Sequence, residues 1–360
     1  MGAPSPIVAR HDDLIVTGGA EGPLSAQIDG IAAALTQAGG GIGDLASLRV
    51  FYRAGTVDPA GLADALADAL HGRAVPTLTL VPVARAGWTS GDLTIEAMAV
   101  TGPTLGVVAG PDARFAVGLR RGRFLFLGAQ GAGVLSDLTG ESRDVMQRLG
   151  QTLTTLGAGF ADVVRMNRWY HAAGTKDAWE PSARAVADFY TEPGPVATAI
   201  SLAAPLPGGR AIQIDLMGML ALDGTSLPKR HSWPDGHWDW PIHLPYKHGL
   251  ACGGIGFVGG QVSIDTQAQV IDSAHLDRQV RRSMANIDRV AAGLGAAAGP
   301  PLRFEVHYAL PGPAGDPLGI AALQALADQG RPVMMAGFAN LSYPGMRVEI
   351  EAMVPLSDRG

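Results

Sequence analysis

The sequence contains a single cysteine, Cys252, among its 360 residues. One thiol cannot form an internal disulfide, and it excludes zinc sites built from several cysteines. Charged residues are also few, at 17%, and the net charge is −6 with no long basic run. Nucleic-acid binding needs a concentrated positive surface, so nucleic acid is not an expected partner. The short cluster Arg120, Arg121 and Arg123 does not change this expectation.

Long apolar runs are missing as well. No run approaches the roughly 20 residues of a membrane span, and the first residues carry no apolar leader. These absences predict a soluble, cytoplasmic protein that makes no contact with membranes. Hydrophobic residues nevertheless form 47% of the chain, which is enough for a packed core. The 49 glycines and 25 prolines predict many turns.

One pattern of apolar residues and turn residues occurs three times. Each copy opens with an apolar run that ends in glycine, at residues 14–19, 124–129 and 256–261, and a helical pattern follows. The copies then continue through a helix-ending glycine, a strand that ends on tyrosine, an acid–proline pair, a strand opened by proline, and a last strand. These landmarks are Gly39, Gly157 and Gly295; Tyr52, Tyr170 and Tyr308; Asp58-Pro59, Glu180-Pro181 and Asp316-Pro317; Pro76, Pro195 and Pro332; and Thr94-Ile95-Glu96, Gln213-Ile214-Asp215 and Glu349-Ile350-Glu351.

The spacing of these landmarks predicts a tandem repeat. They recur after 118–122 residues and again after 136–138 residues, whereas chance matches would scatter. The acid–proline pairs are typical of an N-cap followed by the first helical position, so each is expected to open a helix. We predict domains at residues 1–104, 105–222 and 241–360, joined by a linker rich in Trp and His at 223–240. The first domain is expected to lack its opening strand.

The third copy carries the clearest motifs. It reads LPYKHGLACGGIGFVGGQVSID, then a helical pattern, then RPVMMAGFANLSYPGMRVEIEAMV. It resembles the Rid (YjgF/YER057c/UK114) family, which has a PYSQA-like start, a D-x-x-F-V-S-G-Q-like strand and an EIEAIA-like last strand. The resemblance implies α+β domains of the chorismate-mutase-like kind. It also implies an internal pseudo-trimer with a barrel-like sheet core, helices outside and ligand clefts between copies, so that one chain would form a monomeric ring, alone or in a higher assembly.

The resemblance also implies an activity. Family members resemble enamine or imine deaminases, so we expect a hydrolase or deaminase acting on a C–N bond of a small molecule, with no cofactor. The family's carboxylate-binding arginine stands two residues after the strand proline, where this chain has Leu78, Ala197 and Met334. The usual amino-acid-derived imine is therefore not the expected substrate, unless the nearby Arg331 replaces that arginine. Two alternatives stay open: a binding protein without catalysis and an endoribonuclease, which the acidic charge disfavours.

The candidate catalytic residues lie in the third copy. Glu349 matches the first glutamate of the EIEAIA-like strand, which the resemblance implies in proton transfer, whereas the other copies have Thr94 and Gln213 there. A hydroxyl or an amide cannot transfer protons as a carboxyl does. Tyr246 matches the tyrosine of the PYSQA-like start and, with His248, is expected to orient substrate or water. The residues expected to bind substrate are Lys247, Arg331, Met334, Trp238, Trp240, Arg168 and His171.

The segment before the third copy is rich in aromatic side chains. It holds Trp233, Trp238 and Trp240, three of the six tryptophans. These rings could form a wall over a cleft that encloses a flat ligand, or could pack as a linker on the surface. The histidines at 231, 237, 243 and 248 match no common metal-ligand spacing, so no metal is expected.

Overall fold

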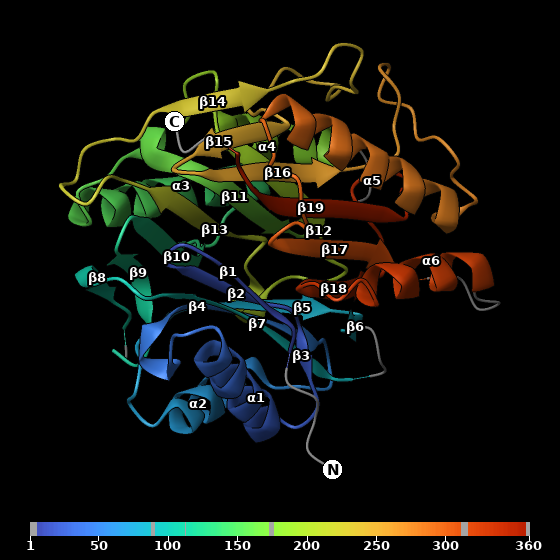
Figure 1. The fold of residues 1–360 in the computed structure, drawn as a ribbon. Coiled ribbons are helices and arrows are strands. Elements are labelled where there is room, and N and C mark those ends of the chain that lie inside the picture. Colours follow the sequence, from blue (N-terminus) through green and yellow to red (C-terminus); the bar gives the residue numbers. More distant parts are fainter. Residues whose placement is uncertain (1–5, 88–90, 112, 173–175, 311–315, 358–360) are drawn as a thin grey trace.

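The computed structural model describes residues 6–87, 91–111, 113–172, 176–310 and 316–357, and it shows a mixed α+β chain (Figure 1). Curved sheets lie inside and helices cover their outer faces. The first segment contains strands β1 (Val8–His11), β2 (Leu14–Thr17), β3 (Ala20–Glu21), β4 (Leu45–Arg53), β5 (Thr77–Val83), β6 (Arg85–Ala86) and β7 (Leu93–Val100), with helices α1 (Leu24–Gln37) and α2 (Pro59–Leu70).

Two further segments follow with the same order of elements. The second contains β8 (Thr104–Ala109), β9 (Ala116–Arg121), β10 (Phe124–Gly131), α3 (Leu138–Thr155), β11 (Val163–Tyr170), α4 (Lys176–Ala187), β12 (Val196–Ser201) and β13 (Ile212–Met219). The third contains β14 (Lys229–Ser232), β15 (Gly249–Cys252), β16 (Ile255–Gln261), α5 (Leu276–Gly293), β17 (Arg303–Ala309), α6 (Pro317–Ala327), β18 (Val333–Phe338) and β19 (Val348–Pro355).

The strand order inside the three segments is also the same. It runs β1-β2-β7-β4-β5 in the first, β9-β10-β13-β11-β12 in the second and β15-β16-β19-β17-β18 in the third. In each, the two strands that flank the second helix are parallel, as a helical crossover requires. This agreement in order and direction is what a tandem repeat predicts.

Local signals explain most of the element ends. Gly39, Gly157 and Gly295 each follow a helix C-cap with φ between +71° and +78°, a left-handed conformation that glycine adopts without strain. The Asp58 carboxylate accepts hydrogen bonds from the backbone N–H groups of residues 60 and 61, and Asp316 caps α6 in the same way. The predictions that a glycine ends each of these three helices and that Asp58-Pro59 and Asp316-Pro317 open helices are therefore confirmed.

Three expectations about local structure were wrong. Glu180-Pro181 does not open a helix, because α4 begins at Lys176 and Pro181 lies inside it. The buried ring of Trp179 packs edge-to-face on Tyr343, which anchors the extra turn. The opening strand expected to be missing from the first segment is present as β1, which pairs with β2. The region expected to be only a linker contains β14, which pairs with β15.

Hydrogen bonds from backbone N–H groups at corresponding positions join the three segments in a cycle. We call each of the three interfaces between segments a seam. The backbone N–H groups of Ala129 and Gly260 each donate to a threonine hydroxyl of the preceding segment, at 3.0 Å in both cases. At the third seam the N–H of Gly19 donates to the carbonyl of Val333, also at 3.0 Å. The short strand β6 then crosses from the first segment to pair with β18 of the third. Each segment thus contacts both others.

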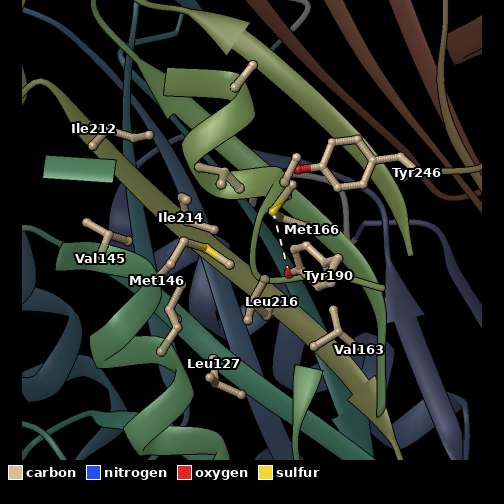
Figure 2. Close-up of a cluster of buried hydrophobic side chains, with 14 of the residues drawn as sticks. Leu127, Val145, Met146, Val163, Met166, Tyr190, Ile212, Ile214, Leu216 and Tyr246 are labelled. Atoms are coloured by element: carbon tan, nitrogen blue, oxygen red, sulfur yellow. Dashed lines mark hydrogen bonds between the residues drawn. The ribbon is translucent and has the colours of Figure 1, made fainter. Parts of the chain in front are cut away.

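Apolar side chains fill the space between each sheet and its helices. In the second segment, Val145 and Met146 of α3 pack on Ile214 and Leu216 of β13, and Tyr190 and Tyr246 border the same cluster (Figure 2). Cys252 is buried in a strand as a free thiol, and burial raises its pKa to about 11. The cysteine is therefore a core residue that is disfavoured as a thiolate.

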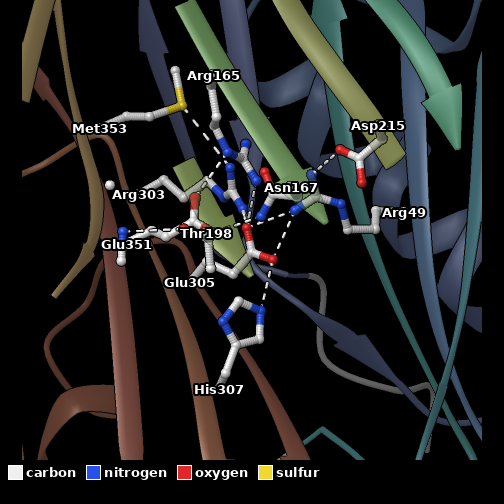
Figure 3. A network of polar contacts seen from close by, with 12 residues as sticks. Arg49, Arg165, Asn167, Thr198, Asp215, Arg303, Glu305, His307, Glu351 and Met353 are labelled. Atoms are coloured by element: carbon white, nitrogen blue, oxygen red, sulfur yellow. Dashed lines mark hydrogen bonds and ion pairs between the residues drawn. The ribbon is translucent and has the colours of Figure 1, made fainter. Parts of the chain in front are cut away.

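A buried ion network occupies the space where the three segments meet (Figure 3). The strand register places Arg49 opposite Glu96, Asn167 opposite Asp215 and Glu305 opposite Glu351, at corresponding positions in the three segments. Arg49 bonds Glu305 at 2.6 Å and Asp215 at 2.5 Å, so a single side chain links all three segments. Arg165 and Arg303 complete the network around Glu305.

We expect the chain to form this assembly as one molecule. All three seams close within a single polypeptide, so no second copy is needed to complete any of them. Sedimentation or light scattering should give a mass near the 37.1 kDa of one chain, or twice that if two such molecules associate. A stable trimer of chains would contradict this prediction. Among the described residues, no helix is both long and apolar enough to cross a bilayer.

Candidate functional site

An apolar cavity lies at the seam between the second and third segments. Its volume is about 70 Å³. Strands β11 and β12 form one wall, and β16, β19 and the Trp-rich segment before β15 form the other. The residues that line the cavity include Arg168, Tyr170, Trp179, Ala197, Thr198, Trp238, Trp240, Tyr246, Gly260, Ser342, Tyr343 and Glu349. Ligand sites often have this character, with a mostly apolar lining and a few polar groups.

Glu349 is the one carboxylic acid among the described residues that line this cavity. It lies on β19 directly against the backbone of Gly260, where an added Cβ would meet its Oε1 at 2.0 Å. No hydrogen bond or ion pair reaches this carboxyl group from the residues that the structure describes. Burial, together with the nearby charge of Glu351, raises the pKa of Glu349 well above its ordinary value. The cavity therefore favours the protonated form of Glu349, which can donate a proton.

Arg168 projects into the same cavity from β11. Its guanidinium lies 4.7 Å from the ring centre of Tyr170, and the residue is buried. Its Nε has no hydrogen-bond partner, and the same is true of the hydroxyls of Tyr246 and Tyr343. Buried polar atoms are rarely left unpaired, because each one costs free energy. Three such atoms therefore surround this cavity with unused hydrogen-bonding capacity.

The wall built from the segment before β15 is held by a buried polar cluster. Gln261 accepts from the indole of Trp238 at 3.2 Å and contacts His237 at 2.8 Å. The Nε2 atom of His248 forms a hydrogen bond with the carbonyl oxygen of Trp238 at 2.9 Å. The His248 ring also stacks on the Trp240 ring, with the ring centroids 4.8 Å apart. Burial lowers the pKa of His248 to about 3, so the ring is neutral at physiological pH. The tryptophans therefore form a fixed wall, which favours the cleft interpretation of this segment.

The structure brings five of the residues named from the sequence to one cavity: Glu349, Tyr246, Arg168, Trp238 and Trp240. Among the described contacts, His248 lies behind this wall and does not line the cavity. Lys247 binds Glu192 at 2.6 Å and lies over the ring of Trp233. His171 lines a neighbouring cavity, discussed below.

Arg331 and Met334 do not belong with the other predicted residues. Both lie on the side of the third segment that faces the first segment, where Arg331 lines a separate cavity with Thr94 and Gly19. Met334 is fully buried in the core. The grouping expected from sequence was wrong because a seam combines the last strand of one segment with the proline-opened strand of the preceding one. Of the three residues that stand two positions after a strand proline, Ala197 is accordingly the one that lines the cavity with Glu349.

At the other two seams, the residues equivalent to Glu349 are Gln213 and Thr94, and both form hydrogen bonds with the backbone. The amide of Gln213 donates to the carbonyl of Leu80 at 2.7 Å, across the seam between the first and second segments. The hydroxyl of Thr94 donates to the carbonyl of Ala20 at 2.9 Å. Both side chains are satisfied by backbone, whereas Glu349 is not. The three seams are therefore chemically unequal.

Several residues that line the cavity were not predicted from the sequence as site residues. Tyr170 was named from the sequence only as a landmark of the repeat, and its hydroxyl donates to Ser342 at 3.2 Å at the edge of the cavity. Ser342 in turn donates to the carbonyl of Ala199 at 2.8 Å. Tyr343 and Trp179 were not predicted either, because neither is a landmark of the repeat.

One buried group has the composition of a metal site. Ligand atoms of Glu305, His307 and Glu351 lie within 4.8 Å of one another. However, Arg49, Arg165 and Arg303 already compensate these carboxylates. A cation there would face three guanidinium groups, so the group is better explained as part of the ion network than as a metal centre.

The fold has a clear relative among solved structures. A chorismatase superposes with a TM-score of 0.60 over 87% of this chain and 93% of that chain, at 14% identity. The fold resembles that of a chorismatase. At this identity the similarity concerns the fold alone. No protein-family model matches the sequence, and no curated protein matches it.

Smaller proteins match single segments. A YjgF/YER057c/UK114 family member from Mycobacterium tuberculosis is 18% identical and covers 32% of this chain and 98% of its own, with a TM-score of 0.29. RidA from an Antarctic Psychrobacter bacterium is 15% identical and covers 31% of this chain and 94% of its own, with a TM-score of 0.28. Structural similarity thus extends to the chorismatase over most of the chain and to Rid proteins over about a third of it.

Proposed function

We propose that the chain is a small-molecule hydrolase with one active site, at the seam that contains Glu349. The observation that carries the proposal is that a buried carboxyl group without a described hydrogen bond and a buried arginine line the same apolar cavity. The substrate we propose is a small carboxylate with an electron-rich carbon–carbon double bond that carries a nitrogen or an oxygen, as in an enamine or an enol ether. Arg168 would bind the carboxylate, with the hydroxyl of Tyr246 as a second donor.

The chemistry follows from the protonation state of Glu349. The neutral acid donates a proton to the carbon of the double bond that does not carry the nitrogen or oxygen, which leaves a cationic C=N or C=O group at the other carbon. Water adds to this carbon, the carboxylate of Glu349 takes back a proton, and the C–N or C–O bond breaks to give a carbonyl product and an amine or alcohol. General acid–base help of this kind contributes roughly 10²–10⁴ in rate. The apolar walls keep competing water away from the cation.

Two substrates discriminate between the bond types. The similar chorismatase acts, by its name, on chorismate, which is a cyclic carboxylate with an enol ether. 2-Aminoacrylate, which is an enamine, represents the C–N alternative. We would incubate the purified chain with each and follow carbonyl product. If neither compound nor related carboxylates turn over while one still binds at this seam, the protein is a binding protein without catalysis.

Replacing Arg168 by methionine should weaken substrate binding. Methionine keeps the apolar stem of the side chain but removes the charge-assisted hydrogen bonds, which are worth about 1.5–3 kcal/mol each. We therefore expect KM to rise about tenfold to a hundredfold, with a smaller change in kcat. Steady-state kinetics on the turned-over substrate would measure both. An unchanged KM would remove Arg168 from the binding role.

A further inference from the structure

A second cavity adjoins the proposed active site. Its volume is about 340 Å³, against about 70 Å³ for the inner cavity. Five residues line both: Tyr170, Trp179, Ser342, Tyr343 and Met346. These shared residues form a partition between the two cavities.

The centre of the partition is an aromatic pair. The rings of Trp179 and Tyr343 meet edge-to-face, with centroids 5.7 Å apart and planes at 79°. They come from different segments, since Trp179 lies on α4 and Tyr343 lies in the loop before β19. Trp179 is buried, and it occupies the extra helical turn described above. The position of Trp179, one residue before the acid–proline pair, holds Val57 and Gly315 in the other copies, so the aromatic pair is particular to this seam.

The two sides of the partition differ in chemistry. The inner side is mostly aromatic and aliphatic, whereas the outer side carries His171, Ser201 and Asn340. His171 is fixed there by a contact between its Nδ1 and the carbonyl of Leu202 at 3.0 Å. A ligand longer than the inner cavity has room only on the polar outer side, and it must displace the aromatic pair to reach it.

We propose that the Trp179–Tyr343 pair determines the largest ligand that the site accepts. The inner cavity takes a ligand with one ring, and the pair excludes a second ring attached end-on to the first. The inference rests on the proposed function only in taking the inner cavity as the ligand site. It requires neither proton transfer by Glu349 nor anion binding by Arg168.

Neutral probes test the partition separately from catalysis. We would titrate phenol and 4-phenylphenol into the full chain by calorimetry. The wild-type chain should bind phenol at least tenfold more tightly than 4-phenylphenol. In Trp179→Ala the cavities merge, so affinity for 4-phenylphenol should rise at least tenfold and the preference should be reversed. Tyr343→Leu removes the other half of the pair and should act in the same direction, which covers the case that Trp179→Ala does not fold.

Two controls separate size selection from general loosening. Trp179→Phe keeps a ring at the partition and should retain the preference for phenol. Phe160→Ala truncates an aromatic that packs on Phe189 and Tyr190 near α4, yet it lines neither cavity. This variant should keep the wild-type preference. The proposal is overturned if the wild-type chain binds both probes equally, if it does not bind phenol, or if both partition variants keep the original preference. Each result is independent of whether any substrate turns over.

Discussion

Changing Glu349 to glutamine should abolish turnover while the fold persists. An amide has nearly the shape of the carboxylic acid but cannot donate and recover a proton. Loss of the general acid should lower kcat by roughly 10²–10⁴, with little change in KM. Glu349 makes no described hydrogen bond or ion pair, so the substitution breaks no contact that holds β19 in place. Steady-state kinetics and circular dichroism on the same sample would measure both outcomes.

The stability of this variant should depend on pH in a defined direction. Burial raises the folded-state pKa of Glu349 above the value of about 4.3 for an unfolded chain. The wild-type fold therefore loses stability as pH rises from that value toward the folded-state pKa. Glutamine does not titrate, so Glu349→Gln should become more stable relative to wild type over the same pH range. Urea unfolding at several pH values would show this.

Two sets of variants control the catalytic prediction. Gln213→Glu and Thr94→Glu place a carboxyl at the corresponding positions of the other seams. Neither should restore turnover when combined with Glu349→Gln, because no equivalent of Arg168 stands there. Asp277→Asn alters a carboxylate of a helical ion pair on α5 and should leave activity unchanged. Full activity of Glu349→Gln would exclude this residue from the mechanism. If the variant failed to fold, Glu349 would be a structural residue, and the binding-protein alternative would gain.

Changing Glu305 to glutamine should cause a large loss of stability. This carboxylate contacts three arginines, Arg49 at 2.6 Å, Arg165 at 2.7 Å and Arg303. Burial alone would raise the pKa of Glu305, but the arginines hold that pKa well below its ordinary value. Removing one partner of a buried ion pair typically costs about 3–5 kcal/mol, because the remaining charges are left without compensation. The free energy of unfolding, measured in urea, should fall by that amount.

An exposed ion pair offers a matched comparison. Arg53 and Asp92 lie 3.4 Å apart, with both side chains about half exposed, so Asp92→Asn should cost less than about 1 kcal/mol. The pH dependence gives a second check on Glu305. A lowered pKa stabilises the fold above the unfolded value of about 4.3, and this contribution is lost as pH falls through the folded-state pKa. The cost of Glu305→Gln should therefore shrink in acid. A cost as small as that of Asp92→Asn would mean that the network contributes little to stability.

The repeat and most helix ends could be read from sequence because they depend on local chemistry. Glycine at a left-handed C-cap and Asp-Pro at a helix start act within a few residues. The failure at Pro181 also had a visible sign, since its spacing from Pro59 is 122 residues whereas the other landmarks shift by 118 or 119. Trp179 determines where α4 begins through contacts made 164 positions away in the chain, at Tyr343, and no local pattern reports such a contact.

The site could be predicted in part, for the same reason. Glu349 and Tyr246 were found through motifs of the third copy, and Trp238 and Trp240 through their unusual density. The role of Arg168 depended on which segment packs against β19. Arg331 and Met334 were grouped with Glu349 because they lie at or beside the position of the family's carboxylate-binding arginine in the same copy, whereas the seams separate them from Glu349 in space. Partners across a seam are a property of the assembled sheets.

The ion network depends on the three copies having different residues at equivalent positions. Arg49, Asn167 and Glu305 occupy one position of the repeat, and so do Ser47, Arg165 and Arg303. Three identical subunits would place three like side chains around their axis, such as three glutamates with nothing to oppose them. A layer of one cation, one amide and one anion requires three different sequences at that level. No single copy excised from this chain should therefore rebuild the ring by itself.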